Sequence, residues 1–168
     1  MTPAAWLTDH ADLLPARARA LDLACGRGRN ALWLGERCAS VLALDRDAAA
    51  IDQLRAEALA RGLPVTAVVS DLESGVRPLP SASFEVIVVI HYLHRPLFPR
   101  LIDALAPGGV LVYETFTRPQ AARGKPTNPD FLLEQGELRR LVAPLEILDW
   151  REGAFEARDI ASVVARRK

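Results

Sequence analysis

The chain has 168 residues, 50% of them hydrophobic and 25% charged, and its 21 Lys and Arg balance its 21 Asp and Glu. This length fits a single domain over residues 1–168 that buries roughly two thirds of its unfolded surface. The composition is that of an ordinary soluble protein. Because the net charge is zero, composition gives no support to a general nucleic-acid surface.

The sequence also argues against a membrane, secreted or metal-binding protein. The longest apolar run, residues 86–90, is far shorter than the about 20 residues of a membrane span. No basic region followed by an apolar core opens the chain, so we expect no secretory signal and a cytoplasmic location. Cys25 and Cys38 form neither a disulfide framework nor a metal pattern. His91 and His94 are three residues apart without a third ligand at suitable spacing, so we expect no metal.

Hydrophobic periodicity predicts strands and helices in alternation. An amphipathic lead-in over residues 1–19 comes first and is closed by Pro15. Apolar runs predict strands at residues 20–24, 41–44, 65–69, 84–90, 110–113, 145–150 and 160–165. Helical spacing predicts helices around residues 30–38, 51–59, 96–106 and 131–142, and Pro78 and Pro80 mark a turn.

Seven strands with intervening helices predict an α/β fold, a doubly wound Rossmann-like sheet with helices on both faces. The fourth strand is the most apolar, so we expect it at the centre. Only a short region around Gly153 joins the last two strands, which predicts an antiparallel C-terminal hairpin in an otherwise mostly parallel sheet.

The stretch from Leu21 to Ala31, LDLACGRGRNA, predicts a strand, a tight turn and the start of a helix. Gly26 and Gly28 lack a Cβ, so the backbone there can take positive φ and approach a ligand closely. Asn30 lies near the helix start, where free amide hydrogens need partners. The spacing Gly-x-Gly-x-x-Ala also satisfies the dinucleotide-binding fingerprint, so the turn alone does not identify the ligand.

Asp22 distinguishes the two kinds of ligand. It lies inside the first strand, where a buried parallel strand should be almost entirely apolar. A buried carboxylate needs a cation or a hydrogen-bond network, and it would repel a pyrophosphate. S-adenosylmethionine instead carries a positive amino group and a sulfonium and has no phosphate. The alternative is that Asp22 only ties down a neighbouring loop through backbone hydrogen bonds.

These features together resemble the class I S-adenosylmethionine-dependent methyltransferases over essentially the full chain. The shared features are the acid in the first strand, the Gly-x-Gly turn, acids after the second and third strands, and the closing hairpin. The segments LDLACGRGRN, HYLHRPL, YETF and GKPTNPDFLL are similar to the small-molecule branch that includes tellurite-resistance and thiopurine methyltransferases.

The resemblance implies S-adenosyl-L-methionine as cofactor and S-adenosyl-L-homocysteine as product. Its cofactor-binding residues fall on Asp22, Ala24, Gly26, Gly28, Asn30, Asp45, Arg46, Asp71, Leu72 and His91. Asp45 takes the ribose position, since a carboxylate accepts hydrogen bonds from two hydroxyls. Two alternatives remain open: Arg46 suits the 2′-phosphate of NADP, and Asp71 can serve as an N-cap or Asx turn before Gly75.

The segment after the fourth strand supplies the candidate catalytic residues His91, Tyr92 and Arg95. A histidine can deprotonate a nucleophile and a tyrosine can hold one in place. A guanidinium at the strand ends binds a carboxylate, either of the cofactor or of an anionic substrate. Equally, His91 can simply pack beneath the cofactor.

The candidate substrate-side residues are Trp6, His94, Glu114, Arg118 and Lys125. We expect Trp6 and the lead-in to cover the pocket together with the connection 115–130, whose basic residues favour an anionic substrate. Glu114 can orient a substrate or pair with Arg95, His94 can instead cap a helix, and the connection can instead be a solvated loop.

The implied reaction is methyl transfer to a small-molecule acceptor by in-line displacement, with the protein supplying proximity and alignment. The alternatives are an NAD(P)-binding oxidoreductase domain and a non-catalytic S-adenosylmethionine-binding partner subunit. We expect no nucleic-acid or membrane partner, and either a monomer or a homodimer.

Overall fold

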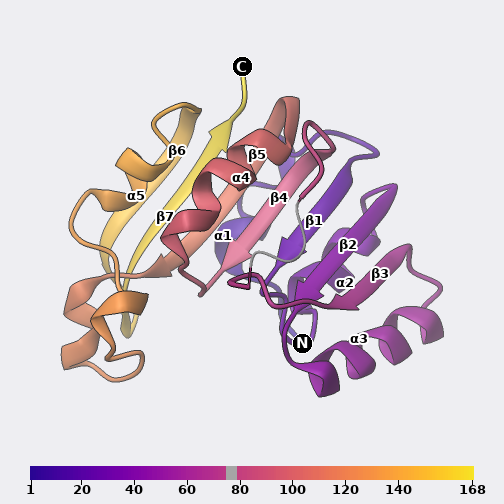
Figure 1. The fold of residues 1–168 in the computed structure, drawn as a ribbon, viewed down its shortest axis with the longest axis horizontal. Coiled ribbons are helices and arrows are strands. Elements are labelled where there is room, and N and C mark those ends of the chain that lie inside the picture. The colour runs from indigo at the N-terminus through magenta and orange to yellow at the C-terminus, as the bar shows by residue number, and fades with distance from the viewer. Residues whose placement is uncertain (75–78) are drawn as a thin grey trace.

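The computed structural model describes residues 1–74 and 79–168, and in this part the strands form a seven-stranded sheet (Figure 1). The strands are β1 (Arg19–Leu23), β2 (Ser40–Asp45), β3 (Val65–Val69), β4 (Phe84–Ile90), β5 (Leu105–Phe116), β6 (Glu146–Phe155) and β7 (Arg158–Arg166). Their order is β3-β2-β1-β4-β5-β7-β6. Strands β1 to β5 pair in parallel, and β7 runs antiparallel between β5 and β6, so the predicted fold class is confirmed.

Strand β4 is the central strand and is buried on both faces, as its apolar sequence predicts. Because side chains alternate along a strand, Val86 and Val88 pack on one face and Ile87 and Val89 on the other. The first face is covered by α1 (Ala5–Thr8), α2 (Arg29–Gly35) and α3 (Ala48–Ala60). The second is covered by α4 (Phe98–Ala104) and α5 (Glu137–Leu141), which lie in front of the sheet in Figure 1.

The helices around residues 30–38 and 51–59 correspond to α2 and α3, but the predicted helix 131–142 is wrong over its first half. A short 3₁₀-helix, η4 (Pro129–Phe131), is followed by Leu132 and Leu133, which are buried. The Leu133 N–H donates to the Phe116 carbonyl at 2.9 Å, so this segment extends along the end of β5. Helix α5 begins only after Gly136, whose φ is 67°. Local periodicity predicted one helix because it does not register this long-range pairing.

Strand β5 is longer than the predicted 110–113 at both ends. Its pairing with β7 extends from Val110 to Phe116, beyond the apolar core of the strand. The predicted helix 96–106 is divided into a 3₁₀-helix, η2 (Arg95–Leu97), and α4. The predicted connection 115–130 contains another, η3 (Arg118–Ala122), and the lead-in contains η1 (Ala11–Leu13) beside α1. The turn expected at Pro78 lies outside the described residues.

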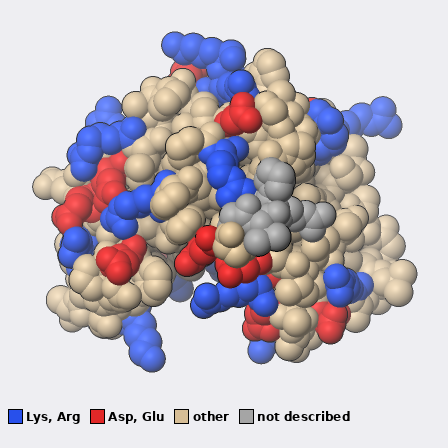
Figure 2. Space-filling view, viewed as in Figure 1, with Lys and Arg blue, Asp and Glu red and all other residues tan. Residues whose placement is uncertain are grey.

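The surface carries charges of both signs. Figure 2 shows Lys and Arg interspersed with Asp and Glu on one face, without a continuous basic field across it. Within residues 1–74 and 79–168, none of the helices has the length and apolar character needed to cross a bilayer.

Candidate functional site

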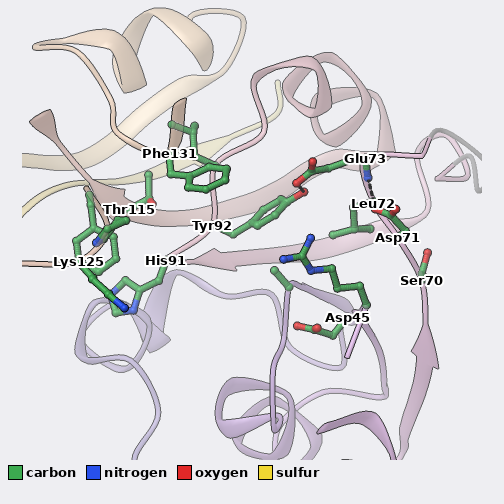
Figure 3. A pocket seen from close by; sticks show the side chains of 15 residues that line it. Asp45, Ser70, Asp71, Leu72, Glu73, His91, Tyr92, Thr115, Lys125 and Phe131 are labelled. Carbon is green, nitrogen blue, oxygen red and sulfur yellow. Dashed lines mark hydrogen bonds between the residues drawn. The ribbon is translucent and has the colours of Figure 1, made fainter. Parts of the chain in front are cut away.

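A cavity of about 530 Å³ lies at the carboxyl ends of the parallel strands, the edge where open α/β sheets bind ligands (Figure 3). Strands β1 to β5 or the residues directly after them all contribute to its wall. The lining residues are Ala24, Asp45, Arg46, Ser70, Asp71, Leu72, Glu73, His91, Tyr92, Leu93, Thr115, Phe116, Lys125, Pro126 and Phe131.

Figure 3 shows that the labelled side chains divide between two ends of the cavity. The first end, here called the β2–β3 end, carries Asp45, Ser70, Asp71, Leu72 and Glu73. The opposite end, the His91 end, carries His91, Thr115, Lys125 and Phe131, with Tyr92 between the two groups. The cavity can therefore hold two ligand parts of different chemistry side by side.

Ala24, in the glycine turn after β1, lines the cavity together with Asp45. Ala24, Gly26 and Gly28 all have left-handed backbone, with φ of 53°, 54° and 81°. A Cβ on Gly28 would lie 2.2 Å from Cδ1 of the buried Leu54, so close packing of α2 on α3 requires glycine there. A Cβ on Gly26 would meet no atom within 4 Å, so that backbone is open to a ligand.

Asp45 joins the turn to the end of β2. Its Oδ2 accepts the Gly26 N–H at 2.7 Å, and its Oδ1 accepts the Asp47 N–H at 2.9 Å. Asp47 in turn caps α3 by accepting the N–H groups of Ala49 and Ala50. The Asp45 carboxylate is therefore fixed at the cavity wall, and its remaining lone pairs suit a pair of ligand hydroxyls.

Asp22 lies behind this turn and is not part of the cavity wall. The side chain is buried, and Oδ2 has no hydrogen-bond partner in the described structure. Burial raises the pKa of Asp22 to about 7, and the Asp45 charge adds to this effect, while the Ala31 N–H and the Arg29 charge oppose it. A cation bound near the turn would favour the ionised carboxylate.

Asp71 makes the Asx turn that the sequence left open as one alternative, and its position at the cavity wall keeps the adenine contact as a prediction. It lines the cavity beside Leu72, and its Oδ1 also accepts the Glu73 N–H at 3.0 Å, which is an Asx turn. The Tyr92 hydroxyl donates to Glu73 Oε1 at 3.3 Å. Burial raises the pKa of Tyr92 well above its usual range, and the Glu73 charge raises it further, so this phenol is a hydrogen-bond donor and not a base.

His91 is held at the opposite end with φ of 59°, an uncommon conformation for a residue other than glycine. The backbone N–H of His91 donates to the Glu114 carbonyl at 2.7 Å. The imidazole ring stacks on the Phe116 ring with a centroid distance of 4.7 Å. Lys125 is positioned through Gln120, whose Nε2 donates to the Lys125 carbonyl at 3.1 Å. Gln120 is buried, and its amide is satisfied because its Oε1 also accepts the Asp159 N–H at 2.9 Å.

Glu114 lies just behind His91 and is buried. Its Oε2 accepts hydrogen bonds from Ser162 Oγ at 2.7 Å and from Arg151 Nη2 at 3.1 Å. Burial works to raise the pKa of Glu114, but the contacts of His91, Ser162 and Arg151 outweigh it and hold the pKa below its ordinary value. Of the two alternatives for Glu114, the pairing with Arg95 is therefore wrong, because Glu114 pairs with Arg151 and Arg95 pairs with Glu137.

Arg95 is instead bound to the protein itself. It makes a bidentate pair with Glu137, from Nε to Oε1 at 2.6 Å and from Nη2 to Oε2 at 3.0 Å. It also donates to the carbonyls of Asp130 and Leu132. Its donors connect η2 to the segment before α5, so the structure does not bring Arg95 to the cavity.

Six other predicted site residues are not among the residues of the cavity wall: the turn glycines Gly26 and Gly28, and four residues that other elements hold. The Trp6 indole is buried and donates to the Val163 carbonyl at 3.2 Å, so the lead-in packs against β7 and residues 1–19 contribute nothing to the wall. Asn30 Oδ1 accepts the Ala4 N–H at 2.9 Å. Arg118 pairs with Glu134 at 2.6 Å, and His94 precedes η2 without a side-chain capping bond.

Sequence reasoning missed several members of the site. Ser70, Glu73, Leu93 and Phe131 line the cavity, and Ser162 and Arg151 hold Glu114. The position of Glu73, two residues after Asp71, was a signal that could have been used. The register that brings β6 and β7 beside Glu114 is a long-range property with no local signal. Among the described residues, no group of three His, Cys, Asp or Glu could hold a metal ion.

The strand order and the ligand edge define a class I methyltransferase fold, and comparison with known proteins agrees. The structure is similar to TehB from Haemophilus influenzae, with a TM-score of 0.83 and 19% identity over 99% of this chain. This chain spans only 63% of the TehB chain. The structure is also similar to an S-adenosylmethionine-dependent methyltransferase from Mesorhizobium loti, with a TM-score of 0.77 and 21% identity over 98% of each chain. A similar enzyme from Aquifex aeolicus has a TM-score of 0.74 and 16% identity, over 98% of this chain and 90% of that one.

The sequence itself shows the family. The profile of a methyltransferase domain matches residues 20–109, more than half of the chain, so the chain belongs to that family. No curated protein matches the sequence. The predicted resemblance to class I methyltransferases is confirmed. The predicted cofactor is confirmed at the level of the family, since solved neighbours are described as S-adenosylmethionine-dependent.

Proposed function

We propose that this protein transfers a methyl group from S-adenosyl-L-methionine to a small acceptor molecule bound at the His91 end of the cavity. The observation that carries the proposal is the cavity itself, with Asp45 and Asp71 at one end and His91 and Lys125 at the other. A volume of about 530 Å³ is within the usual range for a small-molecule site.

The donor set fits this cofactor better than it fits a dinucleotide. Asp22 has an unpaired buried oxygen and Asp45 presents a fixed carboxylate, both close to the glycine turn. A cationic amino group is favoured beside such carboxylates, and a pyrophosphate is not. Asp45 would bind the ribose hydroxyls, and Asp71 with Leu72 would bind the adenine. Bound there, S-adenosylmethionine supplies an electrophilic methyl group that the acceptor attacks in line, leaving S-adenosylhomocysteine.

The His91 end favours an acceptor with an apolar body and a negative charge. Phe116, Pro126 and Phe131 line it together with the ammonium of Lys125. Arg46, the other basic residue of the wall, directly follows Asp45 in the chain, and its charge acts on Tyr92. Lys125 is therefore the residue that we expect to meet an anionic acceptor.

The test is methyl transfer from labelled S-adenosylmethionine to a panel of thiols, metalloid oxyanions and small carboxylates. We expect Lys125→Ala to raise KM for anionic acceptors about tenfold, since a charged hydrogen bond is worth roughly 1.5–3 kcal/mol. Arg118→Ala is the matched control, because Arg118 pairs with Glu134 outside the wall and its loss should leave KM unchanged. Equal effects of the two variants would contradict the assignment of Lys125.

A further inference from the structure

The buried carboxylate of Glu114 uses its two oxygens differently. Oε2 accepts from Ser162 and Arg151 at 2.7 and 3.1 Å. Oε1 faces His91, with 3.7 Å between it and Nε2. This separation is longer than a hydrogen bond, and catalytic hydrogen bonds are often long before substrate binds. Glu114 therefore has one oxygen fixed by the protein and one directed at an imidazole of the cavity wall.

The two nitrogens of His91 also differ. Nε2 is buried and has no hydrogen-bond partner, and it faces the carboxylate. His91 lines the cavity, and Nδ1 is the ring nitrogen that does not face Glu114. We assign the proton of the neutral ring to Nε2, because that nitrogen faces an acceptor. The lone pair is then on Nδ1, the nitrogen left for a ligand.

The backbone supports a functional position for this side chain. His91 has φ of 59° directly after β4, and its ring is stacked on Phe116. A left-handed residue costs free energy and persists only where the surrounding structure imposes it. Packing on one side and Glu114 on the other fix the ring plane, as a base requires.

Resting on the proposed function, we propose that His91 is the general base of the methyl transfer, that Glu114 is its positioning residue, and that the acceptor reacts through an oxygen or nitrogen that carries a proton. The acceptor atom forms a bond to the methyl carbon as the carbon–sulfur bond breaks and its electron pair returns to sulfur. The acceptor proton moves to Nδ1 of His91. The imidazolium then donates from Nε2 to Glu114 and later releases its proton to water.

The charges around the ring are compatible with this step. The groups facing it or its partner are Glu114 on β5, Arg151 on β6, Lys125 of the loop and, across the cavity, Asp45, Arg46, Asp71, Glu73 and Tyr92. Arg151 partly compensates Glu114, so the carboxylate remains ionised while buried. A thiolate acceptor would need no base, and the pair would then have no function in the reaction.

The first test needs no acceptor. Long-range proton–nitrogen NMR of the wild type at pH 9 identifies which ring nitrogen carries the proton in each of the three histidines. We expect His91 to be protonated at Nε2, the nitrogen that faces Glu114, with its lone pair on Nδ1. A ring protonated at Nδ1 would overturn the proposal, because that nitrogen could not accept the acceptor proton. Glu85→Gln removes a carboxylate of β4 that pairs with Arg19, and it should leave the His91 signals unchanged.

The second test uses two acceptors that differ in one atom, 3-hydroxybenzoate and 3-mercaptobenzoate. His91→Asn is the variant, because asparagine tolerates positive φ. We expect the rate with the hydroxyl probe to fall about 100-fold or more and the rate with the thiol probe to change little. Methylation of the thiol alone, or equal losses with both probes, would overturn the proposal. Binding of S-adenosylhomocysteine to the wild type reports separately on the proposed function, so the two failures are distinguishable.

Discussion

Asp22 places a carboxyl group with a pKa of about 7 directly behind the ligand turn. The usual pKa of aspartic acid is about 3.9, so the folded protein holds this proton over a range where the unfolded chain has lost it. The contribution to stability is therefore most favourable at low pH and is lost as the pH rises from about 4 to about 7. Ionisation of Asp22 therefore lowers the free energy of unfolding of the ligand-free protein above neutral pH.

We predict that Asp22→Asn makes the ligand-free protein more stable at pH 8, by on the order of 2 kcal/mol, and leaves stability at pH 4 almost unchanged. The same substitution should weaken S-adenosylhomocysteine binding about tenfold, because the cationic amino group loses a negative neighbour. Wild-type affinity should rise with pH through about 7 and then level off. Urea unfolding and calorimetric titration at both pH values measure these effects, and pH-independent binding would contradict them.

Gly26 and Gly28 share left-handed backbone but differ in the space around them. We predict that Gly28→Ala destabilises the fold by roughly 2–4 kcal/mol, because backbone strain adds to a collision with Leu54. Gly26→Ala should cost only about 1 kcal/mol, from strain alone. Urea unfolding of the two variants measures the difference, and equal costs would mean that packing on Leu54 is unimportant.

Among the elements, η2 depends on Arg95 for its attachment to the segment before α5. Arg95→Ala leaves Glu137 and two carbonyls without their partner, so we predict a loss of roughly 1–3 kcal/mol in the free energy of unfolding. Affinity for S-adenosylhomocysteine should stay within about twofold of the wild type, since a change that does not reach the cavity leaves binding almost unaffected. Arg95→Lys is the control that keeps the charge without the bidentate pair.

The opposite pattern, normal stability with weaker binding, would restore Arg95 as a ligand residue. The sequence predicted that function because an arginine after β4 lies at the ligand edge. The structure differs because the Arg95 guanidinium pairs with Glu137, which lies 42 residues further along the chain.

The confirmed predictions rest on patterns within a few consecutive residues, whereas the wrong ones depended on contacts between residues far apart in the chain. The elements from β1 to β4 were predicted well, since buried parallel strands and helices with regular spacing carry their signal in a few consecutive residues. The turn and the positions of Asp45 and Asp71 followed from the same local order. Helix 131–142 and the extent of β5 were not predictable, because Leu133 and β7 pair with β5 across the sequence. The neighbours of Glu114 come from β6 and β7 for the same reason.

At the scale of the whole molecule, the sheet brings chemically different side chains to its two halves. The ends of β2 and β3 supply the carboxylates Asp45 and Asp71, while β4 and β5 supply His91 and Thr115. The antiparallel β7 lies against β5, so residues from the C-terminal hairpin stand behind the His91 end. We propose that one cavity thereby combines a site for a cationic nucleoside with a site for a small acceptor.

The central claim is that the β2–β3 end binds this cofactor and not a dinucleotide. The most direct measurement is calorimetric titration with S-adenosylhomocysteine, NAD and NADP, using the wild type, Asp45→Ala and Asp45→Asn. Thermal unfolding of each variant controls for loss of the Gly26 hydrogen bond. We predict that the wild type binds S-adenosylhomocysteine alone and that folded Asp45 variants lose at least tenfold in affinity. Binding of NAD or NADP in its place would contradict the account and favour an oxidoreductase.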